Sequence, residues 1–403
     1  MPIANILLHD ASTKGDLERV KHIVSTGAVD VNIRGFYGLT PLMLAAQNGH
    51  YDVFGYLNSK GADLTLVDRD GDHILSMACV GNNMDIVKYV VSKEPTLINK
   101  RRNDGRTALM WAAWHGKKTV FDYLLKEDAD SSLVDDDGYN MLHCACFGGD
   151  TGMMNDAITK TSIDINSSDI YGWTAVMVAA ACGYKDMVDL LFEKESDLSH
   201  IDKMGNNILH VACRGGHVKI VEHILSQEDI DVNCRGQYGG TPLMISAFDG
   251  HRELFDLLVT KGADATLVCN KGNTILHVAC IGGHVEMVKH IMSQGIGDVN
   301  SQNQDGTTPL KSEEQQGCGE TLLSPGVDLS QVNNKGNNVL HLACEIGSME
   351  IVQHVVSQDS LDINAKNSKG ETATVVAKRK HHMDLYEWLV SQGGHVVSKS
   401  YKH

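Results

Sequence analysis

The sequence predicts an all-α solenoid, a stack of small repeated units in which each unit packs only on its neighbours. Three observations support this prediction. A glycine opens each unit and recurs at steps of 33 or 34 residues, and this series contains Gly38, Gly71, Gly105, Gly138, Gly172, Gly205, Gly239, Gly272 and Gly306. The apolar residues inside a unit have helical spacing. Alternate units resemble each other, which gives a longer period of 67 residues, as from Gly38 to Gly105. A repeat of this length is typical of a solenoid with one long exposed face.

Each unit is predicted to be a helix, a turn, a second helix and a hairpin loop. Thr40 can cap the first helix, and Pro41 suits its first turn because the first helical amides have no acceptor within the helix. Gly49 can end this helix, and Gly61 can end the next one. The stretch 64–71 ends in Asp-Gly, which is typical of a hairpin turn.

These residues resemble the ankyrin repeat. The Thr-Pro-Leu-His start of that family is present as Thr40-Pro41-Leu42, Thr241-Pro242-Leu243 and, with isoleucine in place of proline, Thr274-Ile275-Leu276-His277. Its Gly-His turn is present as Gly49-His50, Gly216-His217, Gly250-His251 and Gly283-His284, and its closing Gly-Ala-Asp as Gly61-Ala62-Asp63 and Gly262-Ala263-Asp264. The resemblance covers residues 5 to 393 and implies a solenoid of twelve repeats.

We expect a single ankyrin solenoid over residues 1–403. Its expected parts are an N-terminal capping repeat at 1–34, regular repeats at 35–300, a degenerate short repeat at 301–333, the last two repeats with the C-terminal cap at 334–393, and a tail at 394–403. The degenerate repeat has Glu313-Glu314 where other units have small apolar residues, and buried carboxylates there would be costly. This repeat is either a weak joint or a neutral change in a tolerant array.

Composition limits the compartment and the partners. The formal net charge of −16 disfavours a nucleic-acid partner. The ten cysteines show no disulfide-scaffold spacing, which indicates a reducing compartment. No run approaches the roughly 20 apolar residues of a membrane span, and the N-terminus has no signal-peptide pattern. We therefore expect a cytoplasmic protein, with the nucleus as the alternative, and no membrane insertion.

Pairs of histidine and cysteine raise the question of a metal site. His143/Cys146, His210/Cys213, His277/Cys280 and His341/Cys344 are each three residues apart on predicted helices. Successive pairs lie two layers apart, on the order of 20 Å at about 10 Å per helix layer, whereas zinc ligands lie within about 2.3 Å of the ion. The pairs therefore cannot converge, and we expect no metal. The resemblance implies that each histidine bonds neighbouring backbone and each cysteine fills an alanine position.

No motif for catalysis or cofactor binding is present, so we expect no enzyme, no cofactor and no small-molecule substrate. The carboxylates of Asp135-Asp136-Asp137 are expected at a solvated hairpin tip rather than in a calcium loop. The basic run 378–382 is interpreted as a polar cap of the last repeat, with a nuclear-import signal as the alternative.

Partners of ankyrin proteins lie against the hairpin tips and the concave face of the inner helices, and the resemblance implies the same here. The large rings at such positions are our candidate partner-binding residues: Phe36, Tyr37, Trp114, Tyr139, Phe147, Tyr171, Trp173, Tyr238 and Phe248. Those from Trp114 to Trp173 fall in consecutive repeats and form the favoured patch, because exposed tryptophan and tyrosine anchor interfaces. The alternative is that these rings stack between layers and stabilise the array. Trp111 is expected to face the outer helix.

The sequence therefore favours a non-enzymatic scaffold or adaptor that binds one or more partner proteins. The alternative is a substrate-recruiting regulatory subunit of an enzyme complex.

Overall fold

The computed structural model describes residues 3–27, 29–227, 230–309, 328–357 and 361–396. These residues form α-helices, short 3₁₀ helices and hairpin loops, with isolated bridges but no strands among them, which confirms the all-α prediction. The chain divides into two compact units, Met1–Lys203 and Met204–His403.

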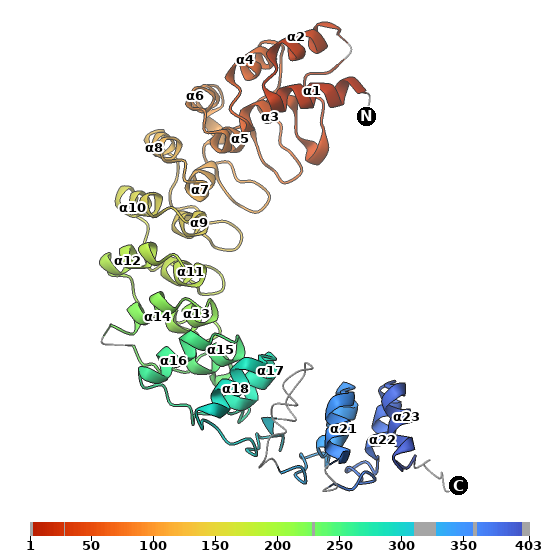
Figure 1. Ribbon diagram of the computed structural model, residues 1–403. Coiled ribbons are helices and arrows are strands. Elements are labelled where there is room, and N and C mark those ends of the chain that lie inside the picture. Colours follow the sequence, from red (N-terminus) through yellow and green to blue (C-terminus); the bar gives the residue numbers. More distant parts are fainter. Residues whose placement is uncertain (1–2, 28, 228–229, 310–327, 358–360, 397–403) are drawn as a thin grey trace. The chain divides into compact units, whose positions relative to one another are not determined.

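In the first unit, inner helices alternate along the chain with outer helices, and each inner helix follows a hairpin loop or the N-terminus (Figure 1). The inner helices are α1 (Ile3–Lys14), α3 (Pro41–Gln47), α5 (Ile74–Gly81), α7 (Ala108–Trp114), α9 (Met141–Gly148) and α11 (Ala175–Cys182). The outer helices are α2 (Leu17–Ser25), α4 (Tyr51–Ser59), α6 (Met84–Lys93), α8 (Lys118–Lys126), α10 (Thr151–Lys160) and α12 (Lys185–Glu193). Two 3₁₀ helices are η1 (Phe36–Gly38) and η2 (Pro95–Leu97).

The second unit repeats this arrangement. Its inner helices are α13 (Ile208–Arg214), α15 (Pro242–Phe248), α17 (Ile275–Gly282), α20 (Val339–Ile346) and α22 (Ala373–Arg379). Its outer helices are α14 (Val218–Ile224), α16 (Arg252–Thr260), α18 (Val285–Ser293), α21 (Met349–Ser357) and α23 (Met383–Ser391), and it has the 3₁₀ helix η3 (Gln237–Gly239).

Local signals begin and end the helices as predicted. The Thr40 hydroxyl accepts the backbone N–H of Met43 at 3.3 Å, with Pro41 in the first turn of α3. Gly49 follows the end of that helix with φ of +73°, a conformation that glycine adopts without steric cost. Thr241 caps α15 in the same way.

The apolar faces of adjacent repeats form the core of each unit. Leu42, Ala45 and Ala46 of α3 are buried, and α3 packs on α5 of the next repeat. Small alanines allow this close approach. Val53 and Phe54 of α4 are also buried, so both helices of the pair contribute to one continuous core.

Backbone hydrogen bonds join successive hairpins within each unit. The N–H of Arg69 donates to the carbonyl of Tyr37 at 2.8 Å, and the N–H of Asn103 donates to the carbonyl of Asp70 at 3.1 Å. In the second unit the N–H of Asn270 donates to the carbonyl of Tyr238 at 2.9 Å. These bonds hold the hairpin tips in a row along each unit.

The part of the chain that the structure describes contains eleven helix pairs. The expected helices of the degenerate short repeat fall largely on residues 310–327, outside the described residues. The count of twelve repeats, the weak joint and the boundaries given above therefore stay predictions.

Candidate partner-binding surfaces

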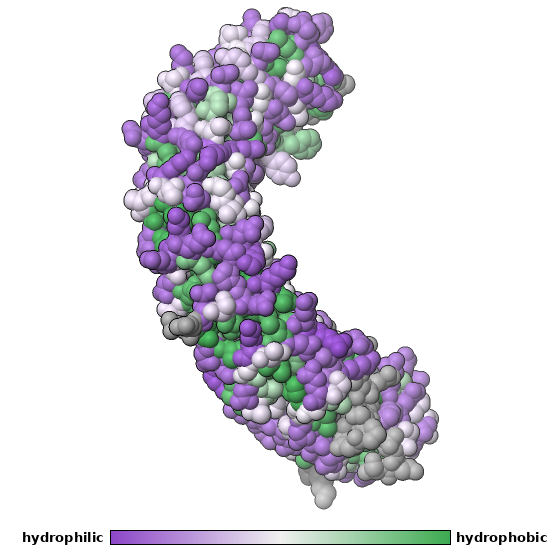
Figure 2. Space-filling model, turned by 60° about the vertical axis from the view of Figure 1, so that its left-hand side comes forward, coloured by the Kyte–Doolittle hydropathy of each residue, from purple (hydrophilic) through white to green (hydrophobic). Residues whose placement is uncertain are grey.

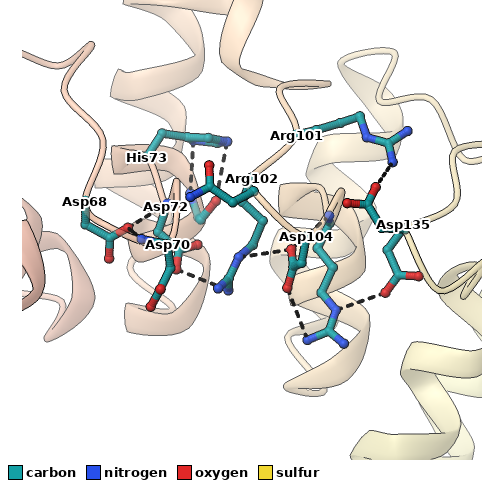
Figure 3. A network of polar contacts seen from close by, with 12 residues as sticks. Asp68, Asp70, Asp72, His73, Arg101, Arg102, Asp104 and Asp135 are labelled. Atoms are coloured by element: carbon teal, nitrogen blue, oxygen red, sulfur yellow. Dashed lines mark hydrogen bonds and ion pairs between the residues drawn. The ribbon is translucent and has the colours of Figure 1, made fainter.

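A polar network connects three successive hairpins of the first unit (Figure 3). Arg102 forms ion pairs with Asp72 at 3.2 Å and with Asp104 at 3.1 Å. Arg106 bridges Asp104 at 3.7 Å and Asp135 of the next hairpin at 3.1 Å. Burial raises the pKa of Asp72 to about 6, although the charge of Arg102 opposes this shift. The network fixes the spacing of these hairpins.

The expectation that the three carboxylates at 135–137 form a solvated tip is wrong for Asp135. This side chain is buried, pairs with Arg106, and accepts the backbone N–H of Tyr139 at 2.8 Å. Asp136 is exposed and pairs with Arg101 at 3.0 Å. The sequence did not reveal the buried position because both arginines come from the preceding hairpin.

Three of the predicted rings form an aromatic cluster that contacts this network through Arg106. The ring of Trp114 stacks on that of Phe147, with centroids 5.2 Å apart and an interplanar angle of 24°. The ring of Tyr139 meets Phe147 edge-on at 5.2 Å. The guanidinium of Arg106 lies 4.7 Å from the centroid of the Trp114 ring. Contacts between layers therefore cover much of Trp114.

Trp111 contacts Arg102 of the hairpin that precedes α7, so the expectation that it faces the outer helix is wrong. Its ring stacks on His115 at 4.9 Å, and the guanidinium of Arg102 lies 5.2 Å from its centroid. The attraction between a cation and an aromatic face accounts for this orientation.

The remaining two rings of the favoured patch lie on the next hairpin. The Nε1 of Trp173 donates to Asp202 at 3.2 Å, which holds the indole half-buried. Tyr171 is 54% exposed at the tip. The structure thus gathers Trp114, Tyr139 and Phe147, and gives Tyr171 and Trp173 other surroundings.

In each unit, one of the described hairpin tips has a tyrosine in the left-handed backbone conformation. Tyr37 and Tyr238 both have φ of +55° and are followed by a glycine with positive φ, which is the geometry of a type I′ turn. A tyrosine in the left-handed region costs on the order of 1 kcal/mol. Arg34 stabilises the first tip by donating to the carbonyl of Gly38 at 3.3 Å, and Arg235 donates to the equivalent carbonyl of the second tip at 3.0 Å. These tips project three of the predicted rings: Phe36 is 81% exposed, Tyr37 66% and Tyr238 74%.

In the second unit the tip forms one wall of a groove of about 510 Å³, here called the second-unit groove. Tyr238 lines this groove together with Met244, Ile245 and Phe248 of α15, which add apolar surface. Phe248 is 43% exposed. The groove brings together two rings that the sequence predicted as partner-binding.

A smaller hollow of about 280 Å³ lies against the tip of the first unit. Phe36, Leu39 and Leu44 provide its apolar lining, together with Ile6 of α1. The acidic Asp10 lies at the same hollow.

Met244, Ile245 and Lys271 are among the residues of the second-unit groove that sequence reasoning missed. The sequence pattern pointed to large rings, whereas these side chains are aliphatic or charged. Ile245 could have been identified from its position in the repeat, because it corresponds to Leu44, 201 residues earlier. Each of these two residues lines the hollow beside the hairpin tip of its own repeat.

The histidine–cysteine pairs have structural partners. The Nε2 of His143 donates to the backbone carbonyl of Trp173 at 2.9 Å, and the Cys146 thiol donates to the carbonyl of Ala175 at 3.1 Å. His277 and His341 make the equivalent bonds at 2.7 and 3.0 Å. Burial lowers the pKa of His143 and His277. For these three histidines and for Cys146, the bonds agree with the structural role that the resemblance implied.

The basic run near the C-terminus lies at the end of α22, where three of its cations have partners. Arg379 pairs with Glu371 at 3.4 Å, and Lys380 pairs with Glu345 at 2.9 Å. The Lys378 ammonium lies 5.1 Å from the centroid of the Tyr386 ring. These contacts fit the interpretation of a polar cap.

Hydrophilic residues predominate on the visible face of the molecule, and hydrophobic residues form separate patches between them (Figure 2). Within the described residues, no helix has the length and apolar character needed to cross a membrane.

Comparisons with known proteins agree with this architecture. A family profile described as ankyrin repeats (3 copies) matches residues 4–68, 56–135, 125–202, 195–269, 243–313 and 311–400. The chain is 24% identical to E3 ubiquitin-protein ligase KEG of Arabidopsis thaliana over 98% of this chain and 24% of that protein. It is 27% identical to human transient receptor potential cation channel subfamily A member 1 over 98% of this chain and 37% of that protein.

A shorter relative is the probable 26S proteasome regulatory subunit p28 of Saccharomyces cerevisiae, 28% identical over 49% of this chain and 89% of that protein. The chain spans 24% and 37% of the lengths of the two larger relatives. The repeated helix pairs, the hairpin row and the profile matches along the sequence agree with one another, and the chain belongs to the ankyrin-repeat family.

Proposed function

We propose that this chain is a non-enzymatic scaffold that binds a partner protein through its hairpin tips and inner helices. The observation that carries the proposal is the second-unit groove, where the exposed rings of Tyr238 and Phe248 flank apolar surface of α15. Protein interfaces draw most of their binding energy from a few aromatic side chains set in such surroundings. The cytoplasm is the proposed compartment, with the nucleus as the alternative.

The strained tips support the same proposal. Tyr37 and Tyr238 adopt a backbone conformation that glycine would adopt at lower cost. Their side chains project into solvent, so the ring gains little from burial within the chain itself. Strain retained at an exposed aromatic residue points to a binding role.

The test is partner capture by variants with altered rings. We expect Tyr238→Ala and Phe248→Ala each to weaken capture of a partner from cell extract by about tenfold, because a hot-spot ring contributes 1–2 kcal/mol or more. Quantitative mass spectrometry of the captured proteins measures this loss. Tyr51→Ala is the matched control, since Tyr51 is an exposed ring on the outer helix α4.

Circular dichroism establishes that the variants fold. If both groove variants capture the same partners as the parent protein, the second-unit groove is not the binding surface. If Tyr51→Ala alone loses the partner, the outer helices bind it instead.

A substrate-recruiting regulatory subunit of an enzyme complex is the second candidate. The names of two relatives favour it, since one is a ubiquitin-protein ligase and another a probable proteasome regulatory subunit. An enzyme that copurifies with this chain in fixed stoichiometry, and loses substrate when Tyr238 and Phe248 are changed, would distinguish this role from a plain scaffold.

A further inference from the structure

The second-unit groove is basic, although the whole chain has a formal net charge of −16. Arg214, the last residue of α13, and Lys271, on the hairpin between α16 and α17, both line it. Both side chains are exposed, and neither takes part in an ion pair among the described residues. Among the described residues that line the groove, Asp249 is the one carboxylate. Burial raises the pKa of this carboxyl, with His251, Arg214 and His284 opposing the shift.

The same arrangement of inner helices and hairpin tip occurs 201 residues earlier in the chain, where the positions of these two cations hold other residues. Tyr37 stands where Tyr238 stands in the later copy, and both tips have the same left-handed tyrosine. The positions of Arg214 and Lys271 are occupied there by Thr13 and Asp70. The fold therefore accommodates a neutral or acidic residue at each position, and the two cations are a property of the groove rather than a requirement of the repeat.

We propose that the second-unit groove binds an acidic segment of a partner protein, with an apolar side chain seated between Tyr238 and Phe248 and carboxylates facing Arg214 and Lys271. This inference rests on the proposed scaffold function and names the chemistry of the partner. Two exposed cations beside an apolar surface, against the single carboxylate of Asp249, favour a ligand that combines carboxylates with an apolar anchor. Their charge also accelerates the approach of an acidic partner, which the rest of this acidic chain repels.

The groove has a size that suits such a ligand. Its volume of about 510 Å³ lies within the range of sites that hold small ligands or a few side chains. The apolar residues Met244 and Ile245 lie on α15, so the anchor rests on a helix that the core holds in place.

The probe is a phage-displayed library of random peptides selected on the immobilised full chain. We expect the enriched peptides to contain aspartate or glutamate next to an aromatic or aliphatic residue. An enriched peptide is then synthesised with a fluorophore, and its affinity is measured by anisotropy at increasing sodium chloride concentration. Affinity should fall with salt, as expected for a charged contact at an accessible site.

The variant that tests the cations uses the residues of the earlier copy, Arg214→Thr with Lys271→Asp. We expect this variant to lower the affinity for the acidic peptide by about tenfold, since two attractions are lost and one repulsion is added. The control is Lys219→Asp with Lys261→Thr, which makes the same change in net charge at exposed positions on α14 and after α16. The control should bind the peptide as the parent does.

Several results would overturn the inference while leaving the scaffold function intact. One is the enrichment of neutral or basic peptides whose binding is lost in the Tyr238→Ala variant. Another is an equal loss of affinity for the acidic peptide in the groove variant and in the control. That result would mean that the net charge of the chain, and not the two groove cations, determines the affinity. Self-association of the chain that the groove variant abolishes would make a second copy the occupant. Peptides insensitive to Tyr238→Ala and to both charge variants would overturn the inference and the proposed groove together.

Discussion

At the scale of single residues, a buried histidine couples the first unit to pH. His73 caps α5 by accepting the backbone N–H of Ser76, and its Nε2 donates to the carbonyl of Lys100 at 3.2 Å. Burial is the largest cause of its lowered pKa, which falls from 6.5 to about 4. The folded state therefore holds the neutral imidazole, whereas the unfolded state takes up a proton below pH 6.5.

We expect His73→Thr to reduce the loss of stability in acid. The contribution of the neutral histidine is fully present above about pH 6.5 and is lost as pH falls toward about 4. The shift corresponds to on the order of 3 kcal/mol over that window. Threonine keeps the helix cap, as Thr40 and Thr107 do in other repeats. Urea unfolding of both proteins at pH 7 and pH 5 measures the difference, and equal losses in the two proteins would contradict it.

The favoured aromatic patch of the first unit makes a second prediction at this scale. Trp114→Ala removes a ring packed between Arg106 and Phe147, and Trp173→Ala removes a ring bonded to Asp202. If the patch anchors a partner, each variant weakens binding by ~2 kcal/mol. Isothermal titration with a captured partner measures this, and urea unfolding measures the stability of each variant. Unchanged affinity in folded variants would leave these rings with the role of stacking between layers.

At the scale of the helix, three glycines allow adjacent inner helices to come close. Gly81, Gly148 and Gly282 end α5, α9 and α17, and their positions differ by one or two of the long sequence periods. A Cβ atom at Gly148 would meet the backbone carbonyl of Trp114 at the end of α7. Backbone cannot move aside as a flexible side chain can, so the small residue is required by the packing of neighbouring repeats.

We expect Gly148→Ala to destabilise the protein by about 1–3 kcal/mol, as overpacking does in other cores. The matched control is Gly55→Ala in α4, where a Cβ would meet no atom within 4 Å. That change should stabilise by about 0.5–1 kcal/mol, because alanine is the better helix former. Thermal unfolding of the two variants measures both effects, and a stable Gly148→Ala protein would contradict the close approach.

The sequence predicted the helices better than the contacts between them. Thr40 and Gly49 act within their own helix, so local chemistry placed them correctly. The surroundings of Trp111 and Asp135 were predicted wrongly because each depends on an arginine. Arg102 lies over the Trp111 ring, and Arg106 forms an ion pair with Asp135 of the next repeat. Tyr238 and Phe248 were named individually, but their meeting at one groove depends on the fold of η3 against α15. Residue type thus indicated each candidate, and only the packing of layers showed which of them meet.

At the scale of the whole molecule, burial comes from neighbouring repeats. Inner helices contact the inner helices before and after them, as α7 does with α5 and α9, and outer helices such as α4 contact α2 and α6. The stability of such an array is the sum of repeat terms and interface terms. A local change should therefore act mainly on the repeats that it touches.

Hydrogen exchange of the Gly148→Ala variant tests this expectation. The added methyl group would strain the interface between α9 and α7, so we expect faster exchange in those helices and in α11, which also packs on α9. Exchange in α1 and α2 of the same unit should match the parent protein, because these helices pack on each other and on α3 and α4 rather than on the altered repeat. Mass spectrometry of peptic fragments resolves these segments. Equal acceleration in all of them would mean that the chain unfolds as one cooperative body, and the additive description of its repeats would then be wrong.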